Sequence, residues 1–208
     1  AALESFVRNN PTDSLAAEAQ YLKGMTYMDM GEYPLAAVEF QILRKDYPTA
    51  ERVEDAFFAE GMAYFNQVGS VERDMTGAYE AREHFLKFLE TYPRSPRVAE
   101  VHEVLGQISD LLVEKRLKQA HVYRQLGRHE AVALTLDDLL VNEPGSSLLD
   151  RVLWERAKAA ERLDDVDTAR ETYERLEREF PDSKWARQAA GALRRLKGRG
   201  DPDDEPTG

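Results

Sequence analysis

The sequence predicts an all-α fold, a superhelix of stacked helical hairpins with about ten helices. Three observations predict it. Small and aromatic residues recur together: "GMTYM" at Gly24 returns as "GMAYF" at Gly61, 37 residues later. Prolines recur at the same interval, as in Pro144 and Pro181. No strand-like alternation of apolar and polar residues holds for more than a few residues, so helical repeats explain the period best.

The first complete hairpin shows why these offsets arise. Gly24 and Ala36 are expected where two antiparallel helices cross, because small residues let the helices approach, and Phe40 is expected to fill the space beside the crossing. Gly31 suits a left-handed residue at the end of the first helix. Pro48 ends the second helix, since the residue before a proline is displaced from the α region. This spacing is the tetratricopeptide pattern, in which each hairpin completes its core by stacking on its neighbours.

The repeats assign the helices in chain order. Residues 1–9 are expected to be the second helix of a truncated repeat, so that the chain begins within a repeat. Ser95 and Ser183 follow turn prolines and are expected to cap the next helices. The remaining helices are predicted near 14–30, 32–47, 52–66, 76–92, 97–126, 128–142, 147–163, 166–180 and 183–197.

Two departures from the period mark special segments. Pro93 and Pro144 are 51 residues apart, 14 more than the period, which predicts one elongated helix near 97–126. A long turn at 66–77 is predicted to be a protruding loop of functional interest. The domain prediction is a single solenoid over 1–197, with an N-terminal half 1–96 and a C-terminal half 97–197, followed by a disordered acidic tail at 198–208.

Composition excludes several classes of function. The formal net charge of −11 argues against nucleic-acid binding. There is no cysteine, so disulfides and thiolate chemistry are excluded, and the four histidines lack the spacing of metal ligands. No phosphate-binding loop, dinucleotide fingerprint or nucleophile elbow occurs. We therefore expect a protein that is not an enzyme, with no cofactor and no metal.

The first helix of each hairpin is expected to line the concave face of the solenoid. In the N-terminal half this face is rich in methionine and aromatic residues, which suits a groove for an extended apolar peptide. The alternative, that several of these residues belong to the core, stays open at this point. The candidate groove residues are Tyr21, Met25, Met28, Phe58, Met62 and Phe65.

The corresponding face of the C-terminal half is mostly basic. Arginine and tryptophan are frequent anchors at interfaces, and a basic stripe suits an acidic protein partner. A solvated face with local ion pairs is the alternative. The candidate docking residues are His121, Arg124, Arg151, Trp154, Lys158 and Arg162.

Three stretches together carry a family resemblance. They are "YLKGMTYMDMGEYPLAAVEFQILRKDYP", then "FAEGMAYF" with its long turn and "AREHFLKFLETYPRSP", and the elongated helix that runs into "AHVYRQLGRHEAVALTLDDLL". In this order they resemble the BamD (ComL) family of outer-membrane β-barrel assembly lipoproteins over nearly all of residues 1–197. The lipid-attachment cysteine that family members carry is absent from this chain, so membrane contact is expected only through an anchor that this chain does not include.

The resemblance implies a non-enzymatic scaffold on the periplasmic face of the bacterial outer membrane. Its N-terminal repeats would bind unfolded outer-membrane protein precursors, and its C-terminal repeats would bind the periplasmic domains of a BamA-type barrel protein and sometimes accessory lipoproteins. Two alternatives remain. One is another periplasmic repeat adaptor of the Tol–Pal-associated type, and the other is a cytoplasmic tetratricopeptide adaptor.

Overall fold

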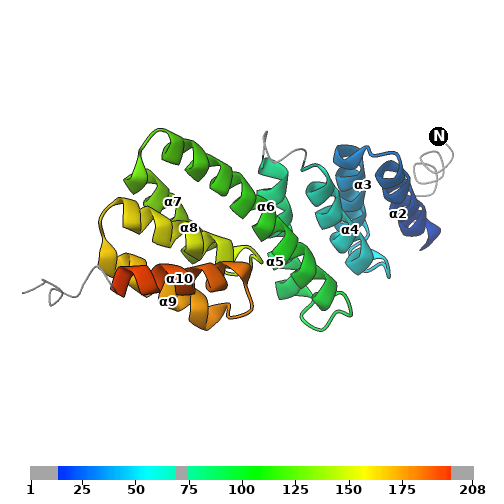
Figure 1. Ribbon diagram of the computed structural model, residues 1–208. Helices are drawn as coiled ribbons and strands as arrows, with labels where there is room; N and C mark the ends of the chain where they lie inside the picture. Colours follow the sequence, from blue (N-terminus) through cyan, green and yellow to red (C-terminus); the bar gives the residue numbers. More distant parts are fainter. Residues whose placement is uncertain (1–13, 69–74, 198–208) are drawn as a thin grey trace, which may run out of the picture. The chain divides into compact units, whose positions relative to one another are not determined.

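The computed structural model describes residues 14–68 and 75–197, which form nine helices and contain no strand (Figure 1). The fold is therefore the all-α repeat fold that the periodicity predicts, and the elongated helix is confirmed. The helix predicted at 1–9 lies outside the described residues, as do 69–74 of the predicted loop and the tail at 198–208. The helices are α2 (Ser14–Asp29), α3 (Tyr33–Asp46), α4 (Val53–Asn66), α5 (Thr76–Thr91), α6 (Val98–Gln125), α7 (His129–Asn142), α8 (Leu149–Arg162), α9 (Val166–Glu179) and α10 (Lys184–Lys197).

The chain divides into two compact units, unit 1 up to Ile108 and unit 2 from Ser109 onward. In unit 1, α2 packs on α3, α3 on α4 and α4 on α5, so that helices consecutive in the chain are neighbours in space. In unit 2, α7 packs on α8, α8 on α9 and α9 on α10. The boundary lies within α6, so this helix contributes residues to both cores.

Each hairpin core is built around a small residue on the first helix and a large residue on the second. A Cβ atom added to Gly24 would lie 2.5 Å from Cε1 of Phe40, and one added to Gly61 would lie 2.8 Å from Phe85. Both phenylalanine rings are fully buried. The glycine therefore makes room for an aromatic ring of its partner helix, which refines the expectation that it lets two backbones approach. Equivalent buried pairs in unit 2 are Ala120 with Leu136 and Ala157 with Tyr173.

The turn within a hairpin requires one left-handed residue. Gly31 and Gly127 have φ values of 74° and 69°, as the periodicity predicts, and Asp164 takes the equivalent place in the last hairpin with φ 57°. Residues other than glycine adopt this conformation only at a cost in conformational free energy. The two glycines are thus conformational requirements of the turns.

One substitution is expected to have opposite effects at two glycines. Gly127→Ala should lower the free energy of unfolding by about 1 kcal/mol, because alanine disfavours positive φ. Gly191 lies within α10, and a Cβ atom there would meet nothing within 4 Å. Gly191→Ala should therefore raise stability by about 0.5–1 kcal/mol. Urea denaturation of both variants measures this, and the same sign at both positions would contradict it.

The turns between hairpins are held by serines. Ser95 Oγ accepts a hydrogen bond from the Arg97 amide at 3.0 Å, and Ser183 Oγ accepts one from the Trp185 amide at 3.0 Å. Ser183 immediately precedes α10 and caps it as predicted, whereas Ser95 lies three residues before the first residue of α6 and holds the turn ahead of that helix instead of capping it. Each hydroxyl also donates to a carboxylate at the start of an earlier helix, Ser95 to Glu54 and Ser183 to Asp150, both at 2.5 Å. These bonds fix the stacking of one hairpin on the next.

Candidate functional site

A cover of arginine lies over two of the candidate groove residues in unit 1. The Arg52 guanidinium lies 5.1 Å from the centre of the Tyr21 ring, and that of Arg97 lies 4.6 Å from the Phe58 ring. Phe58 is only 8% exposed and packs against Phe85, with ring centres 5.7 Å apart. Phe58 is therefore a core residue that supports this face, and it offers little surface to a peptide.

The other groove residues keep part of their surface. Tyr21, Met25 and Met28 on α2 are half-buried and pack against the core cluster of α3 and α4. Met62 and Phe65 on α4 are half-buried as well. The structure thus places five apolar side chains of the two first helices at the boundary between core and solvent, where a flexible thioether or a ring edge can contact a partner.

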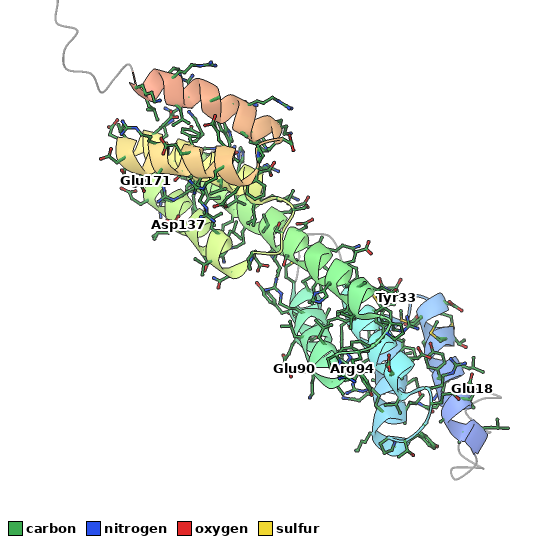
Figure 2. All side chains as sticks on the ribbon, turned by 90° about the horizontal axis from the view of Figure 1, so that it is seen from below. Glu18, Tyr33, Glu90, Arg94, Asp137 and Glu171 are labelled. Carbon is green, nitrogen blue, oxygen red and sulfur yellow. The ribbon has the colours of Figure 1, made fainter. Side chains whose placement is uncertain are left out.

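A ladder of ion pairs joins the first helices of unit 1, and the sequence reasoning missed it. Glu18 of α2 (labelled in Figure 2) accepts from Arg52 at 2.8 Å, and Arg52 also donates to Asp55 at 3.1 Å. Asp55 in turn accepts from Arg97 at 2.8 Å, and Arg97 pairs with Glu100 at 3.3 Å. The signal that could have revealed it is the pair of opposite charges at the start of α4, where Arg52 and Asp55 stand nine and six residues before Gly61.

The ladder holds Asp55, Arg52 and Arg97 in their charged forms. Burial by itself would raise the pKa of Asp55, but hydrogen bonds and charges from Arg97 and Arg52 outweigh burial and lower it. The hydrogen bond to Glu18, with a second to Asp55, raises the pKa of Arg52. The pairs of Asp55 with Arg52 and Arg97 therefore persist across the ordinary pH range and keep both guanidinium groups over the aromatic rings beneath them.

Unit 2 repeats this cover with different residues. Trp185, at the start of α10, stacks on Trp154 of α8, with ring centres 5.7 Å apart and planes 23° apart. Tyr173 of α9 also packs against Trp154, with ring centres 5.5 Å apart. Trp154 was expected on the docking face; it is half-buried and packs against the core of α8, α9 and α10. Trp185 stands four residues after the turn proline Pro181, the same position that Arg52 and Arg97 hold after Pro48 and Pro93.

The other half of the predicted docking face surrounds a cavity of about 460 Å³ between α6, α7 and α8. Its floor is apolar and its rim is charged. His121, Arg124 and Arg151 line it, whereas Trp154, Lys158 and Arg162 do not. The structure thus brings together three of the six predicted docking residues. The floor is formed by Leu117, Ala120, Val132 and Leu136, and the rim also includes Glu114, Lys118, Val122 and Glu155.

The basic groups on this rim differ in whether they have an ion-pair or hydrogen-bond partner within the protein. Arg124 forms an ion pair with Glu155 and lies 2.7 Å from His121 Nδ1. Gln125 contacts the other ring nitrogen of His121 at 3.0 Å. Within the described part of the chain, no carboxylate pairs with the Arg151 guanidinium, which is exposed. Arg151 is therefore the rim cation most available to a carboxylate from outside.

A second cavity, of about 660 Å³, lies between α3, α4 and α5 and is polar. At its floor the Glu60 carboxylate, only 3% exposed, accepts from Arg44 at 2.5 Å and from the Tyr64 hydroxyl at 3.1 Å. Burial raises the pKa of Tyr64 to about 12. His84 Nε2 bonds the Phe57 carbonyl at 2.8 Å, and burial lowers its pKa. This cluster ties three helices together, and Glu60 within the apolar run before Gly61 was its sequence signal.

The described residues offer little that suggests other chemistry. In the part of the chain that the structure describes, no group of three histidine, aspartate or glutamate side chains is placed to hold a metal ion. None of the helices described combines the length and apolar composition that crossing a bilayer requires. What the described residues present instead is a partly apolar face in unit 1 and a rimmed apolar cavity in unit 2.

Stacked helical hairpins with such faces define the class of tetratricopeptide-repeat proteins, and a tetratricopeptide-repeat family model matches residues 151–183. A second family model, YfiO, described as an outer membrane lipoprotein, matches residues 27–147. The chain belongs to this outer membrane lipoprotein family. The family places it at the outer membrane, on the periplasmic side, and confirms the resemblance seen in the sequence.

Two relatives are proteins called outer membrane protein assembly factor BamD. The one from Neisseria meningitidis serogroup B is 22% identical over 188 residues, which cover 86% of this chain and 70% of the relative. The one from Neisseria gonorrhoeae is 22% identical over 189 residues, with 86% and 71% covered. The similarity therefore extends over most of both proteins.

Proposed function

We propose that the chain is a non-enzymatic scaffold of the outer-membrane β-barrel assembly machinery. The observation that carries this proposal is its similarity, over 86% of its length, to proteins named as outer membrane assembly factors. A repeat fold with exposed faces suits a scaffold, because stacked hairpins offer long surfaces to protein partners. In this role unit 2 docks the periplasmic domains of a BamA-type barrel protein, and unit 1 binds unfolded outer-membrane protein precursors.

The cavity of unit 2 is the proposed docking site for the barrel protein. Its volume of about 460 Å³ accommodates an apolar side chain on the floor of Leu117, Ala120 and Leu136. Arg151 on the rim lacks a carboxylate partner within the described residues, and His121 is exposed beside it. The partner segment that fits is an apolar anchor residue next to an aspartate or glutamate.

The proposed precursor surface in unit 1 is the set of half-buried apolar residues on α2 and α4. Methionine adapts to partners of different shape, which suits a surface that must accept many unfolded sequences. Phe58 is left out of this surface because its ring is buried beneath Arg97. The surface comprises Tyr21, Met25, Met28, Met62 and Phe65.

The two surfaces are expected to be separable by mutation. Arg151→Glu should weaken binding to purified periplasmic domains of the BamA-type protein by about tenfold or more, because it places a carboxylate where an acidic partner group would bind. Arg162→Glu makes the same charge change on the same helix, away from the cavity, and should stay within about twofold of the parent protein. Isothermal titration calorimetry measures both affinities.

The precursor surface gives the complementary result. Met28→Ala with Phe65→Ala should weaken binding of an unfolded precursor peptide by more than about 1 kcal/mol while leaving barrel-protein binding unchanged.

Equal losses of affinity for the barrel protein in Arg151→Glu and Arg162→Glu would show that overall charge, and not the cavity, governs docking. Absence of any binding to the barrel protein would reject the scaffold assignment.

A further inference from the structure

The last helix of unit 2 carries charge of one sign only. α10 contains five basic residues and no acidic residue, in a chain whose formal net charge is −11. All five basic side chains are exposed. The solvent-facing side of a helix in a soluble protein is polar, but such faces ordinarily mix both signs of charge. The five residues are Lys184, Arg187, Arg194, Arg195 and Lys197.

The opposite side of α10 fixes the helix in place. Its alanines and leucines are buried in the core that α8 and α9 form, and Trp185 stacks on Trp154. Figures 1 and 2 both show α10 lying alongside α9. The basic side chains therefore stand on a rigid support, and a partner that binds them needs no reordering of the helix. The buried residues are Ala186, Ala189, Ala192, Leu193 and Leu196.

Three of the cations of α10 have no carboxylate partner among the described residues, whereas Arg195 interacts electrostatically with Glu161. Among the described residues, no carboxylate lies within ion-pair distance of Arg187, Arg194 or Lys197. The neighbouring helix differs, since Arg175 of α9 pairs with Glu179 at 2.9 Å. Three unpaired cations on one helix repel one another, and a ligand that supplies carboxylates relieves this repulsion.

The centre of the face is bare. A Cβ atom added to Gly191 would meet nothing within 4 Å, so the space above this half-buried residue is open. On a helix, residues three and four positions away are neighbours, so Arg187, Arg194 and Arg195 surround Gly191. A partner's backbone can thus approach closely between arginines, whose planar guanidinium groups bind carboxylates through two hydrogen bonds.

We infer that the Arg187–Gly191–Arg194–Arg195 face of α10 is a docking surface for an acidic helix of a partner protein. Glutamates spaced three or four residues apart on that helix would meet the arginines on either side of Gly191. The surface lies beyond residue 183, the last residue that either family model matches, and shares no residue with the unit 2 cavity. It is therefore a second interaction surface, independent of the proposed function.

An anionic membrane surface fits these observations less well. The net charge of −11 opposes approach of the chain to such a bilayer. α10 also exposes no large apolar side chain that would enter the headgroup region. Lipid phosphates would be met by any cluster of cations and make no use of the bare centre at Gly191.

The probe for the test is a fluorescent helical peptide of the length of α10 that carries glutamates along one face. A second peptide has glutamine at those positions. Fluorescence anisotropy with the full chain is expected to show binding of the glutamate peptide that weakens as salt is added, and much weaker binding of the glutamine peptide. Equal binding of the two peptides would overturn the inference, because charge would then play no part.

Charge reversal locates the site. The triple variant Arg187→Glu, Arg194→Glu and Arg195→Glu should weaken binding of the glutamate peptide by about tenfold or more. A matched variant reverses three exposed basic residues of unit 1 and so has the same net charge, and it should stay within about twofold. The control substitutions are Lys45→Glu, Lys87→Glu and Arg94→Glu.

A charge-conserving variant guards against misfolding. The triple variant Arg187→Lys, Arg194→Lys and Arg195→Lys keeps α10 basic. Its affinity for the glutamate peptide should fall only about threefold, because lysine cannot form the bidentate hydrogen bonds that arginine forms with a carboxylate. Equal weakening by the reversal and control variants would overturn the inference. So would binding to phosphatidylglycerol vesicles, lost in the reversal variant, together with no binding of the glutamate peptide, because α10 would then be a membrane-binding helix.

Discussion

Gly24→Ala is expected to lower the free energy of unfolding by about 1–3 kcal/mol, although alanine is the better helix former. The reason is steric. The new Cβ atom would lie 2.5 Å from Cε1 and 2.8 Å from Cδ1 and Cζ of Phe40, whose ring is fully buried. A buried ring cannot move without displacing its own neighbours, which include Tyr21 at 5.7 Å between ring centres.

A compensating substitution tests this explanation directly. Unit 2 uses Ala120 and Leu136 with the same 16-residue spacing that separates Gly24 and Phe40. Phe40→Leu should therefore relieve the overlap that Gly24→Ala creates. The loss of stability in the double variant is expected to be smaller than the sum of the two single losses by about 1 kcal/mol or more.

The chain provides its own control for this measurement. Its two tryptophans, Trp154 and Trp185, both lie in unit 2. In urea denaturation, far-UV circular dichroism follows both units, whereas tryptophan fluorescence follows unit 2. The Gly24 and Phe40 variants should alter the dichroism more than the fluorescence. Simple additivity of the two single losses would mean that Gly24 is not there to accommodate the Phe40 ring.

Arg44→Met is expected to cost about 3–5 kcal/mol of stability, because it leaves a buried carboxylate without its cation. Arg44 Nη1 lies 2.5 Å from Glu60 Oε2, and the Glu60 side chain is 3% exposed. The guanidinium also lies 3.5 Å from the centre of the Phe57 ring. Methionine can keep much of that apolar contact, so the loss isolates the charge.

Two further variants distinguish the origins of this loss. Adding Glu60→Gln to Arg44→Met removes the unpaired charge and should recover part of the stability, leaving a deficit of about 1–3 kcal/mol. Arg175→Met breaks the exposed pair with Glu179 and should cost less than about 1 kcal/mol. If Arg44→Met and the double variant unfold at the same urea concentration, the loss comes from packing on Phe57 and not from the buried charge.

Local rules of chain geometry explain how much of the fold could be predicted. Gly31 and Gly127 end helices because only glycine adopts positive φ freely, and Ser95 and Ser183 hold turns because their hydroxyls reach the next amides. These effects act within a few residues. The helix positions, the elongated α6 and the small residues of each hairpin were therefore predictable from spacing alone.

The candidate sites were less predictable, because they depend on contacts between distant residues. Phe58 and Trp154 occupy equivalent repeat positions and were expected on binding faces, yet Arg97 covers one and Trp185 covers the other. The covering residues lie 39 and 31 positions further along the chain. Helical periodicity gives the direction of a side chain but not what the next hairpin places over it.

The sequence by itself determined the repeat class, the helix order and the turn residues, because each rests on spacing along one chain, and the order of three sequence stretches carried the resemblance to the family. Only the tertiary structure decided which apolar residues face solvent, which cations are already paired and where the cavity lies. Burial and ion pairing are set by side chains that meet across hairpins, such as Arg44 with Glu60 and Arg124 with Glu155. Those meetings depend on how the hairpins stack, which no single repeat specifies.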